Sequence, residues 1–146
     1  PRSSPWCDDM PSTATVRALH ATASPAASNT ASPQAALSFD HVWLFVEFTK
    51  GSLTSLDIEL EFGHWVTGTG LVWDKVYDSQ GTQVKLNFTA NFDGWIVFSS
   101  QHDNTRMAPV PLGGEVWRTV VTPNGTASGS SIAVKAQPFS LGALRE

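Results

Sequence analysis

The sequence contains little of what disulfides, zinc sites and nucleic-acid contacts require. Its 146 residues include a single cysteine, Cys7, which excludes an intramolecular disulfide and a cysteine-based zinc site. Nine residues are Lys or Arg and thirteen are Asp or Glu, which gives a net charge of −4. Because binding to phosphate groups needs a basic surface, this balance argues against nucleic acid as a partner.

Long apolar stretches are missing as well. No run of about 18 apolar residues occurs, so the sequence offers no candidate for a membrane-spanning helix. The first residues lack the charged region and the following apolar stretch of a signal peptide. We therefore expect neither a membrane partner nor a secretory leader.

Motifs typical of catalysis or cofactor binding do not occur either. The sequence has no Gly-rich phosphate-binding pattern and no GxSxG nucleophile elbow. The four histidines lack the HxH or HExxH spacing of zinc ligands; they are His20, His41, His64 and His102. We therefore expect no catalytic residue, no metal, no cofactor and no enzymatic activity.

The most conspicuous cluster of titratable residues is an acidic trio within residues 55–62. Asp57, Glu59 and Glu61 alternate with apolar residues, so a strand would place all three on one face. A calcium site would need a loop that supplies further oxygen ligands, and no loop has the required spacing. We interpret the trio as the solvated face of an edge or outer strand.

The first 37 residues differ in composition from the rest of the chain. They are mostly Ser, Thr, Ala and Pro, with few large apolar side chains. Ordering such a segment costs backbone entropy that so few apolar contacts do not offset, so we expect it to bind surfaces outside its own domain. We predict an extended N-terminal arm over residues 1–37, with the partner-binding residues Arg2, Trp6, Met10, Val16, Arg17 and Leu19.

Residues 38–146 have the pattern of an all-β domain. Short runs rich in Val, Ile, Phe, Trp and Thr alternate with clusters of Gly, Asn, Asp and Ser. We expect residues 41–48 and 55–62 to form a hairpin through 49–52, and residues 115–121 and 131–136 to form a last pair. Further strands are expected over 83–89 and 92–98, and two short ones between 63 and 81. The pattern favours an antiparallel two-sheet β-sandwich, of which a jelly roll is one variant.

Six tryptophans are an unusually high number for this length. Trp43, Trp95 and Trp117 lie within strong strand patterns, where packing in the core or between subunits is expected. Trp65 and Trp73 lie in the irregular stretch and are the candidates for an exposed aromatic surface. Such a surface could stack on sugar rings or lie at the centre of a protein interface.

Two stretches resemble parts of a known group of proteins. Residues 42–62, VWLFVEFTKGSLTSLDIELEF, and residues 125–134, GTASGSSIAV, are similar to the opening hairpin and to the final turn and strand of small virion proteins of tailed bacteriophages. The resemblance implies a β-sandwich structural protein, in particular a head decoration or cement protein on the outer surface of the capsid. It implies synthesis in the host cytoplasm, the major capsid protein as partner, and self-association as a homotrimer. Residues 63–78 depart from the pattern of such proteins, which leaves the position in the virion open.

The arm and the resemblance together suggest a capsid cement protein whose arm clamps neighbouring subunits. Two alternatives stay open. One is a carbohydrate-binding module or receptor-binding virion protein that uses exposed Trp residues. The other is a tail or neck connector protein built on the same sandwich.

Overall fold

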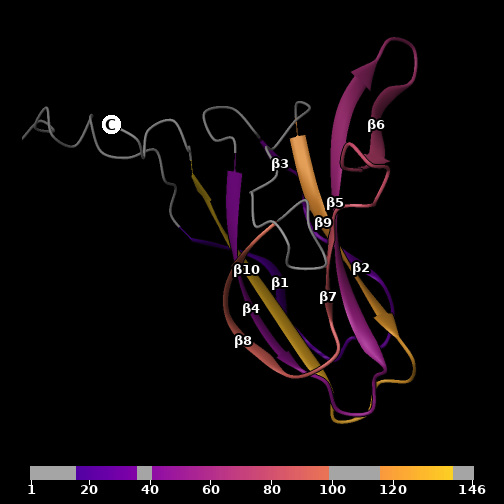
Figure 1. The fold of residues 1–146 in the computed structure, drawn as a ribbon. Helices are drawn as coiled ribbons and strands as arrows, with labels where there is room; N and C mark the ends of the chain where they lie inside the picture. The colour runs from indigo at the N-terminus through magenta and orange to yellow at the C-terminus, as the bar shows by residue number, and fades with distance from the viewer. Residues whose placement is uncertain (1–15, 36–40, 99–115, 140–146) are drawn as a thin grey trace, which may run out of the picture.

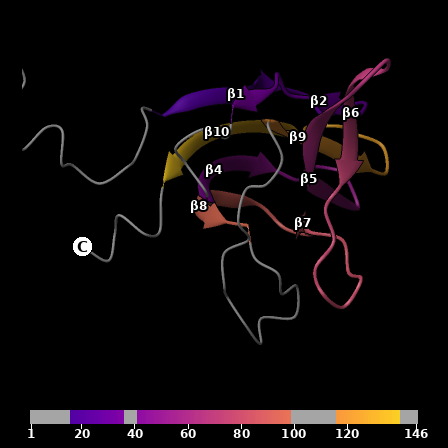
Figure 2. The same cartoon turned by 90° about the horizontal axis from the view of Figure 1, so that it is seen from above.

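The computed structural model describes residues 16–35, 41–98 and 116–139, which form β-strands and no helix. The strands pair into two antiparallel sheets, so the all-β antiparallel class expected from the sequence is confirmed. In Figures 1 and 2 the sheet that contains β4 and β10 lies on the left, and the sheet that contains β5 and β9 lies on the right.

The first sheet, here sheet A, has four strands in the order β1-β10-β4-β8. Their bounds are Arg17–Ala23 for β1, Ser131–Phe139 for β10, His41–Thr49 for β4 and Phe92–Val97 for β8. β4 is a central strand because β10 pairs along one side of it and β8 along the other.

The second sheet, sheet B, is built around β5, a strand of 12 residues. Its strands are β2 (Asn29–Thr30), β3 (Gln34–Ala35), β5 (Ser55–Val66), β6 (Gly70–Lys75), β7 (Lys85–Phe88) and β9 (Val116–Asn124). β9 pairs along one side of β5, and β6 and β7 share its other side. β2 and β3 in turn pair with β9.

Within the described residues, buried side chains of both sheets form one hydrophobic cluster. Successive side chains of a strand point to opposite faces, so alternate residues of β4 and β10 enter the core from sheet A, and alternate residues of β5, β7 and β9 enter it from sheet B. Leu44, Val134, Ile58 and Trp117 are fully buried members of this core. For Trp117 the sequence allowed packing in the core or between subunits, and the structure places it in the core.

The predicted hairpin of residues 41–48 and 55–62 and the predicted pair of residues 115–121 and 131–136 are both wrong, because each joins strands of different sheets. β4 belongs to sheet A and β5 to sheet B, and the same division separates β10 from β9. The connection after β4 crosses between the sheets and buries Leu53 completely. It packs on the connection between β9 and β10, where the Ser130 hydroxyl donates a hydrogen bond to the Lys50 carbonyl oxygen at 2.6 Å. The turn residues in the sequence therefore predicted where one strand ends and the next begins. They did not predict that the next strand would belong to the other sheet.

Part of the predicted arm lies within the sheets. β1 pairs with β10, and β2 and β3 pair with β9, so residues 17–35 belong to the body rather than to an arm ending at residue 37. His20 of β1 is buried between the sheets, with 2.7 Å from its Nδ1 to Asn29 Oδ1 and 2.9 Å from its Nε2 to Thr119 Oγ1. β1 is an edge strand whose pairing with β10 has two irregularities of register. Residues 1–15, 36 and 37 of the predicted arm lie outside the described residues.

The weakly patterned stretch after residue 62 forms a hairpin. β5 continues to Val66, the chain turns, and β6 returns from Gly70. The turn is closed by a hydrogen bond of 3.0 Å from the Thr69 N–H to the Val66 carbonyl oxygen. The hairpin projects past the ends of the neighbouring strands (Figure 1).

Candidate functional site

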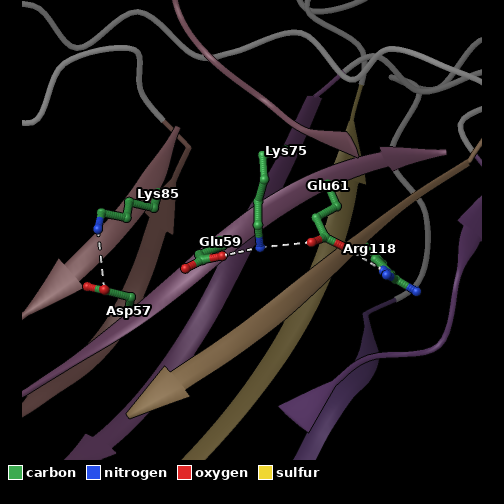
Figure 3. A network of polar contacts seen from close by, with 6 residues as sticks. All are labelled: Asp57, Glu59, Glu61, Lys75, Lys85 and Arg118. Atoms are coloured by element: carbon green, nitrogen blue, oxygen red, sulfur yellow. Dashed lines mark hydrogen bonds and ion pairs between the residues drawn. The ribbon is translucent and has the colours of Figure 1, made fainter. Parts of the chain in front are cut away.

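The acidic trio of β5 lies in a ladder of ion pairs on the outer face of sheet B (Figure 3). Lys85 of β7 contacts Asp57 at 3.3 Å, and Arg118 of β9 contacts Glu61 at 2.7 Å. Lys75 of β6 contacts Glu59 and Glu61, the latter at 2.9 Å. Three carboxylates therefore meet three cations, and each neighbour of β5 along these residues supplies one cation.

The surroundings differ from the solvated outer strand that the sequence suggested. β5 is central in sheet B, and Asp57 and Glu61 are buried. Burial by itself raises the pKa of the Glu61 carboxyl, but hydrogen bonds from Lys75 and Arg118 outweigh it and hold the pKa below its ordinary value. Burial likewise lowers the pKa of Lys75, while Glu59 and Glu61 bring it above its ordinary value. The trio is thus engaged in holding the strands of sheet B together.

Two amide side chains complete the surroundings of Asp57. Asn87 Nδ2 donates to Asp57 Oδ1 at 2.6 Å, and Asn124 Nδ2 donates to Ser55 Oγ at 2.9 Å and lies 3.5 Å from Asp57 Oδ2. Each asparagine is itself the first residue of an Asn-X-Ser/Thr pattern in the sequence. The nitrogen that glycosylation would modify is therefore occupied in hydrogen bonds in each case.

The projecting β5–β6 hairpin carries the two tryptophans expected on the surface. Trp65 is 62% exposed. Trp73 is half-buried, because its ring lies over Gly63 and the Arg118 guanidinium sits 4.1 Å from the ring centroid. No charged residue occurs between Trp65 and Trp73 in the sequence. The hairpin tip is therefore uncharged, and Trp65 is its most exposed aromatic side chain.

The outer face of sheet A carries two further tryptophans, which sequence reasoning assigned to packing. Trp43 is 39% exposed and Trp95 is 47% exposed. The ring of Trp43 stacks on Phe139 at 5.7 Å, and the ring of Trp95 meets Phe45 at 5.2 Å. The residues of β4 are apolar on both faces, which is typical of a strand covered on both sides. In the structure β4 is central within its sheet, but one of its faces is open at Trp43.

A hollow of about 430 Å³ lies further along β4 and β8 on the same face of sheet A as these aromatic residues. Glu47 of β4 and Asp93 of β8 are paired in register and line the hollow. They lie two residues along their strands from the pair Phe45 and Trp95, on the same face of the sheet. The rest of its lining is mixed, with hydroxyl, amide and apolar groups: Thr22, Phe48, Thr49, Asn91, Phe92, Ser131 and Ala133. The hollow thus offers hydrogen-bonding groups next to an aromatic surface.

The histidines are not brought together within the described residues. His20 lies between the sheets, His41 stacks on Phe139 at 5.4 Å, and His64 contacts Asp74 at 3.5 Å on the hairpin. In the described ranges no group of three or more His, Cys, Asp or Glu side chains could hold a metal ion. The same ranges contain no helix that is long and apolar enough to cross a membrane. His102 and Cys7 lie outside the described residues.

The predicted contact residues of the arm fall into two groups. Arg2, Trp6 and Met10 lie outside the described residues. Arg17 Nη1 donates to Gln34 Oε1 at 2.8 Å, and Leu19 packs against the core of its own chain. Val16 is exposed. The structure therefore uses Arg17 and Leu19 within the body, where the sequence suggested a partner subunit.

Comparisons of this chain with protein-family models, with curated proteins and with solved structures found no match.

Proposed function

We propose that the chain is a structural protein of a tailed-phage virion that binds the outer surface of the capsid as a decoration protein. In this proposal its two sheets form a β-sandwich, and the β5–β6 hairpin is the element that docks on the major capsid protein. The observation that carries the proposal is the hairpin itself, which projects from the molecule with an uncharged tip and an exposed Trp65.

The position of the two phage-like stretches supports the proposal. Residues 42–62 run through β4 and β5, and residues 125–134 lead into β10. They lie side by side: β4 pairs with β10, and the Ser52 N–H donates to the Ser128 carbonyl oxygen at 3.0 Å. The resemblance therefore concerns one contiguous unit of the fold, formed by two adjacent crossings between the sheets.

The physical character of the hairpin favours a protein surface as its binding partner. A two-stranded ribbon is marginally stable in water, and Trp is among the residues that contribute most to protein interfaces. Docking of the tip would remove Trp65 from water without leaving a charged group of the tip unpaired. A shell groove that accepts one large aromatic side chain would fit this shape.

The proposal keeps an N-terminal arm that contacts neighbouring subunits, but the arm is shorter than the one expected from the sequence. Because residues 17–35 belong to the sheets, we place the tether to neighbouring subunits in residues 1–16, with Arg2, Trp6, Met10 and Val16 as contacts. Self-association as a homotrimer would multiply these attachments and raise the avidity for a symmetric shell.

Binding to purified phage heads tests the proposal. Trp65→Ser should weaken binding to heads by at least about tenfold, because loss of a central interface tryptophan typically costs 2 kcal/mol or more. Tyr77→Ser is the matched control, since Tyr77 is 58% exposed but lies outside the hairpin. Equal binding of Trp65→Ser and the unmodified chain would contradict the proposal. Binding to purified tails in place of heads would favour a tail or neck connector.

A further inference from the structure

We propose that the outer face of sheet A binds a neutral oligosaccharide. The proposed site consists of an aromatic row, defined as Trp43, Phe45 and Trp95, and of the adjoining hollow with Glu47 and Asp93. It lies on the opposite sheet from the ion-pair ladder and the β5–β6 hairpin, and it does not depend on the proposed attachment to a capsid.

The two exposed tryptophans of the row are held in place before a ligand arrives. Trp43 stacks on the buried Phe139, and Trp95 rests against the half-buried Phe45. In register Phe45 faces Trp95 and Trp43 faces Val97, so the tryptophans are diagonal neighbours whose Cα atoms should lie about 7–8 Å apart. Fixed rings at this spacing offer an apolar platform without the entropy cost of ordering them on binding.

The hollow supplies the hydrogen-bonding groups that a polyol needs. The carboxylates of Glu47 and Asp93 accept hydrogen bonds, Asn91 both donates and accepts, and the hydroxyls of Thr49 and Ser131 do the same. Glu47 lies two residues after Phe45 on β4, so the polar groups follow the aromatic row along the strand direction at about 7 Å. A chain of sugar rings could therefore stack on the row and extend its hydroxyls into the hollow.

The charges on this face argue for a neutral ligand over a cationic one. The Lys135 ammonium lies 5.8 Å from the centroid of the Phe45 ring, so a cation already occupies the surroundings of the aromatic row. A second cation stacked there would be repelled, while an anionic ligand would be repelled by Glu47 and Asp93. A neutral polyol meets neither repulsion and can use both the donor at Lys135 and the two acceptors.

Affinity electrophoresis of the full chain in gels that contain a soluble neutral polysaccharide tests the site. Hydroxyethyl cellulose, glucomannan and dextran are the probes, and dextran sulfate and an oligo-arginine peptide are the charged comparisons. We expect at least one neutral polymer to retard the chain, and Trp43→Ala and Trp95→Ala to weaken that binding at least tenfold. Tyr77→Ala, an exposed aromatic outside the face, should bind as the unmodified chain does.

Glu47→Gln and Asp93→Asn keep the shape of the hollow but remove its charges. We expect each variant to weaken polysaccharide binding at least threefold while its circular dichroism spectrum stays unchanged. If a tryptophan variant fails to fold, these two variants still test whether the hollow binds the polysaccharide. The proposal is overturned if no neutral polymer retards the chain, or if only a charged probe binds. It is also overturned if Trp65→Ala abolishes binding while Trp43→Ala and Trp95→Ala retain it.

Discussion

Gly51 shows at the scale of a single residue how the two crossing connections depend on close contact. Its φ of +55° lies in the region that favours glycine, and a Cβ atom built there would lie 2.3 Å from the Ser128 carbonyl oxygen. The glycine was visible in the sequence only as a turn residue, because its contact partner lies 77 positions away in the chain. Local pattern predicts such a turn, while the tight packing of two connections depends on the fold.

We predict that Gly51→Ala destabilises the protein much more than Gly68→Ala. Both glycines have positive φ, but a Cβ at Gly68 would meet nothing within 4 Å. Gly68→Ala should therefore cost only the backbone term of about 1–2 kcal/mol, and Gly51→Ala should add the displacement of the second connection. Urea unfolding of the two variants makes the comparison, and equal losses would contradict the packing of the connections.

His20 is the second residue whose surroundings lead to a measurable effect. Its burial lowers the pKa of the imidazole, although the hydrogen bond with Asn29 opposes the shift in part. The unfolded chain then binds a proton more readily than the folded one. The contribution of His20 to stability is fully present above its ordinary pKa of 6.5 and declines as the pH falls from there toward the folded value.

We therefore expect the free energy of unfolding to decrease between pH 7.5 and pH 5.5, and His20→Gln to reduce this decrease. His64→Gln is the control, since the His64 side chain is 48% exposed. Urea titrations of the three proteins at both pH values supply the measurement. If His20→Gln keeps the full pH dependence of the unmodified protein, the imidazole is not the group responsible.

β5 shows at the scale of elements what sequence reasoning can and cannot provide. The alternation of Leu56, Ile58 and Leu60 with the acidic trio predicted both the strand and its buried face. It did not predict that three other strands would each bring a cation to the trio, because side-chain pairing across strands depends on which strands become neighbours. The same limit explains Trp43 and Trp95: the strand is recognisable from its residues, but whether a second layer covers it is not.

The ion-pair ladder gives a prediction at this scale. Lys75→Met removes the cation shared by Glu59 and Glu61, and we expect a loss of about 1–2 kcal/mol in unfolding free energy. The loss should be smaller than for a fully enclosed pair, because the Lys75 side chain is 41% exposed. Lys135→Met, a change of an exposed lysine on sheet A, is the control for unfolding in urea at pH 7. A loss in Lys75→Met no larger than in this control would contradict the structural role of the ladder.

The acid side of the stability curve tests the same ladder. Because the pKa of Glu61 is lowered in the folded state, its contribution is present above the ordinary value of 4.5 and is lost as the pH falls through the folded pKa. Glu61→Gln should therefore flatten the dependence of stability on pH below about pH 4.5. An unchanged slope in that range would show that Glu61 is not paired in the folded protein.

The N-terminal third of the chain decides the organisation of the whole molecule. Low apolar content predicted an arm, but β1 contributes His20 to the space between the sheets and Leu19 to the edge of the core. Composition is a weak guide here, because an edge strand needs few large side chains when its backbone is paired with a neighbour. The outline of an all-β body was predictable, while its N-terminal boundary depended on long-range pairing.

Two truncations separate a tether from a structural segment. Removal of residues 1–15 should leave the melting temperature of the body within a few degrees and reduce its binding to heads. Removal of residues 1–35 should prevent stable folding, because it deletes β1, β2 and β3. Calorimetry and head binding of both truncated chains supply the test. An unchanged melting temperature after removal of residues 1–35 would show that these strands do not stabilise the body.

The most direct test of the proposed function is an electron-microscopy reconstruction of phage heads saturated with the purified chain. We predict additional density on the outer surface of the shell, arranged with the symmetry of the capsid, in which the β5–β6 hairpin and Trp65 face the major capsid protein. Heads without additional density, or density in which the hairpin points away from the shell, would contradict the assignment of the chain as a decoration protein that docks through this hairpin.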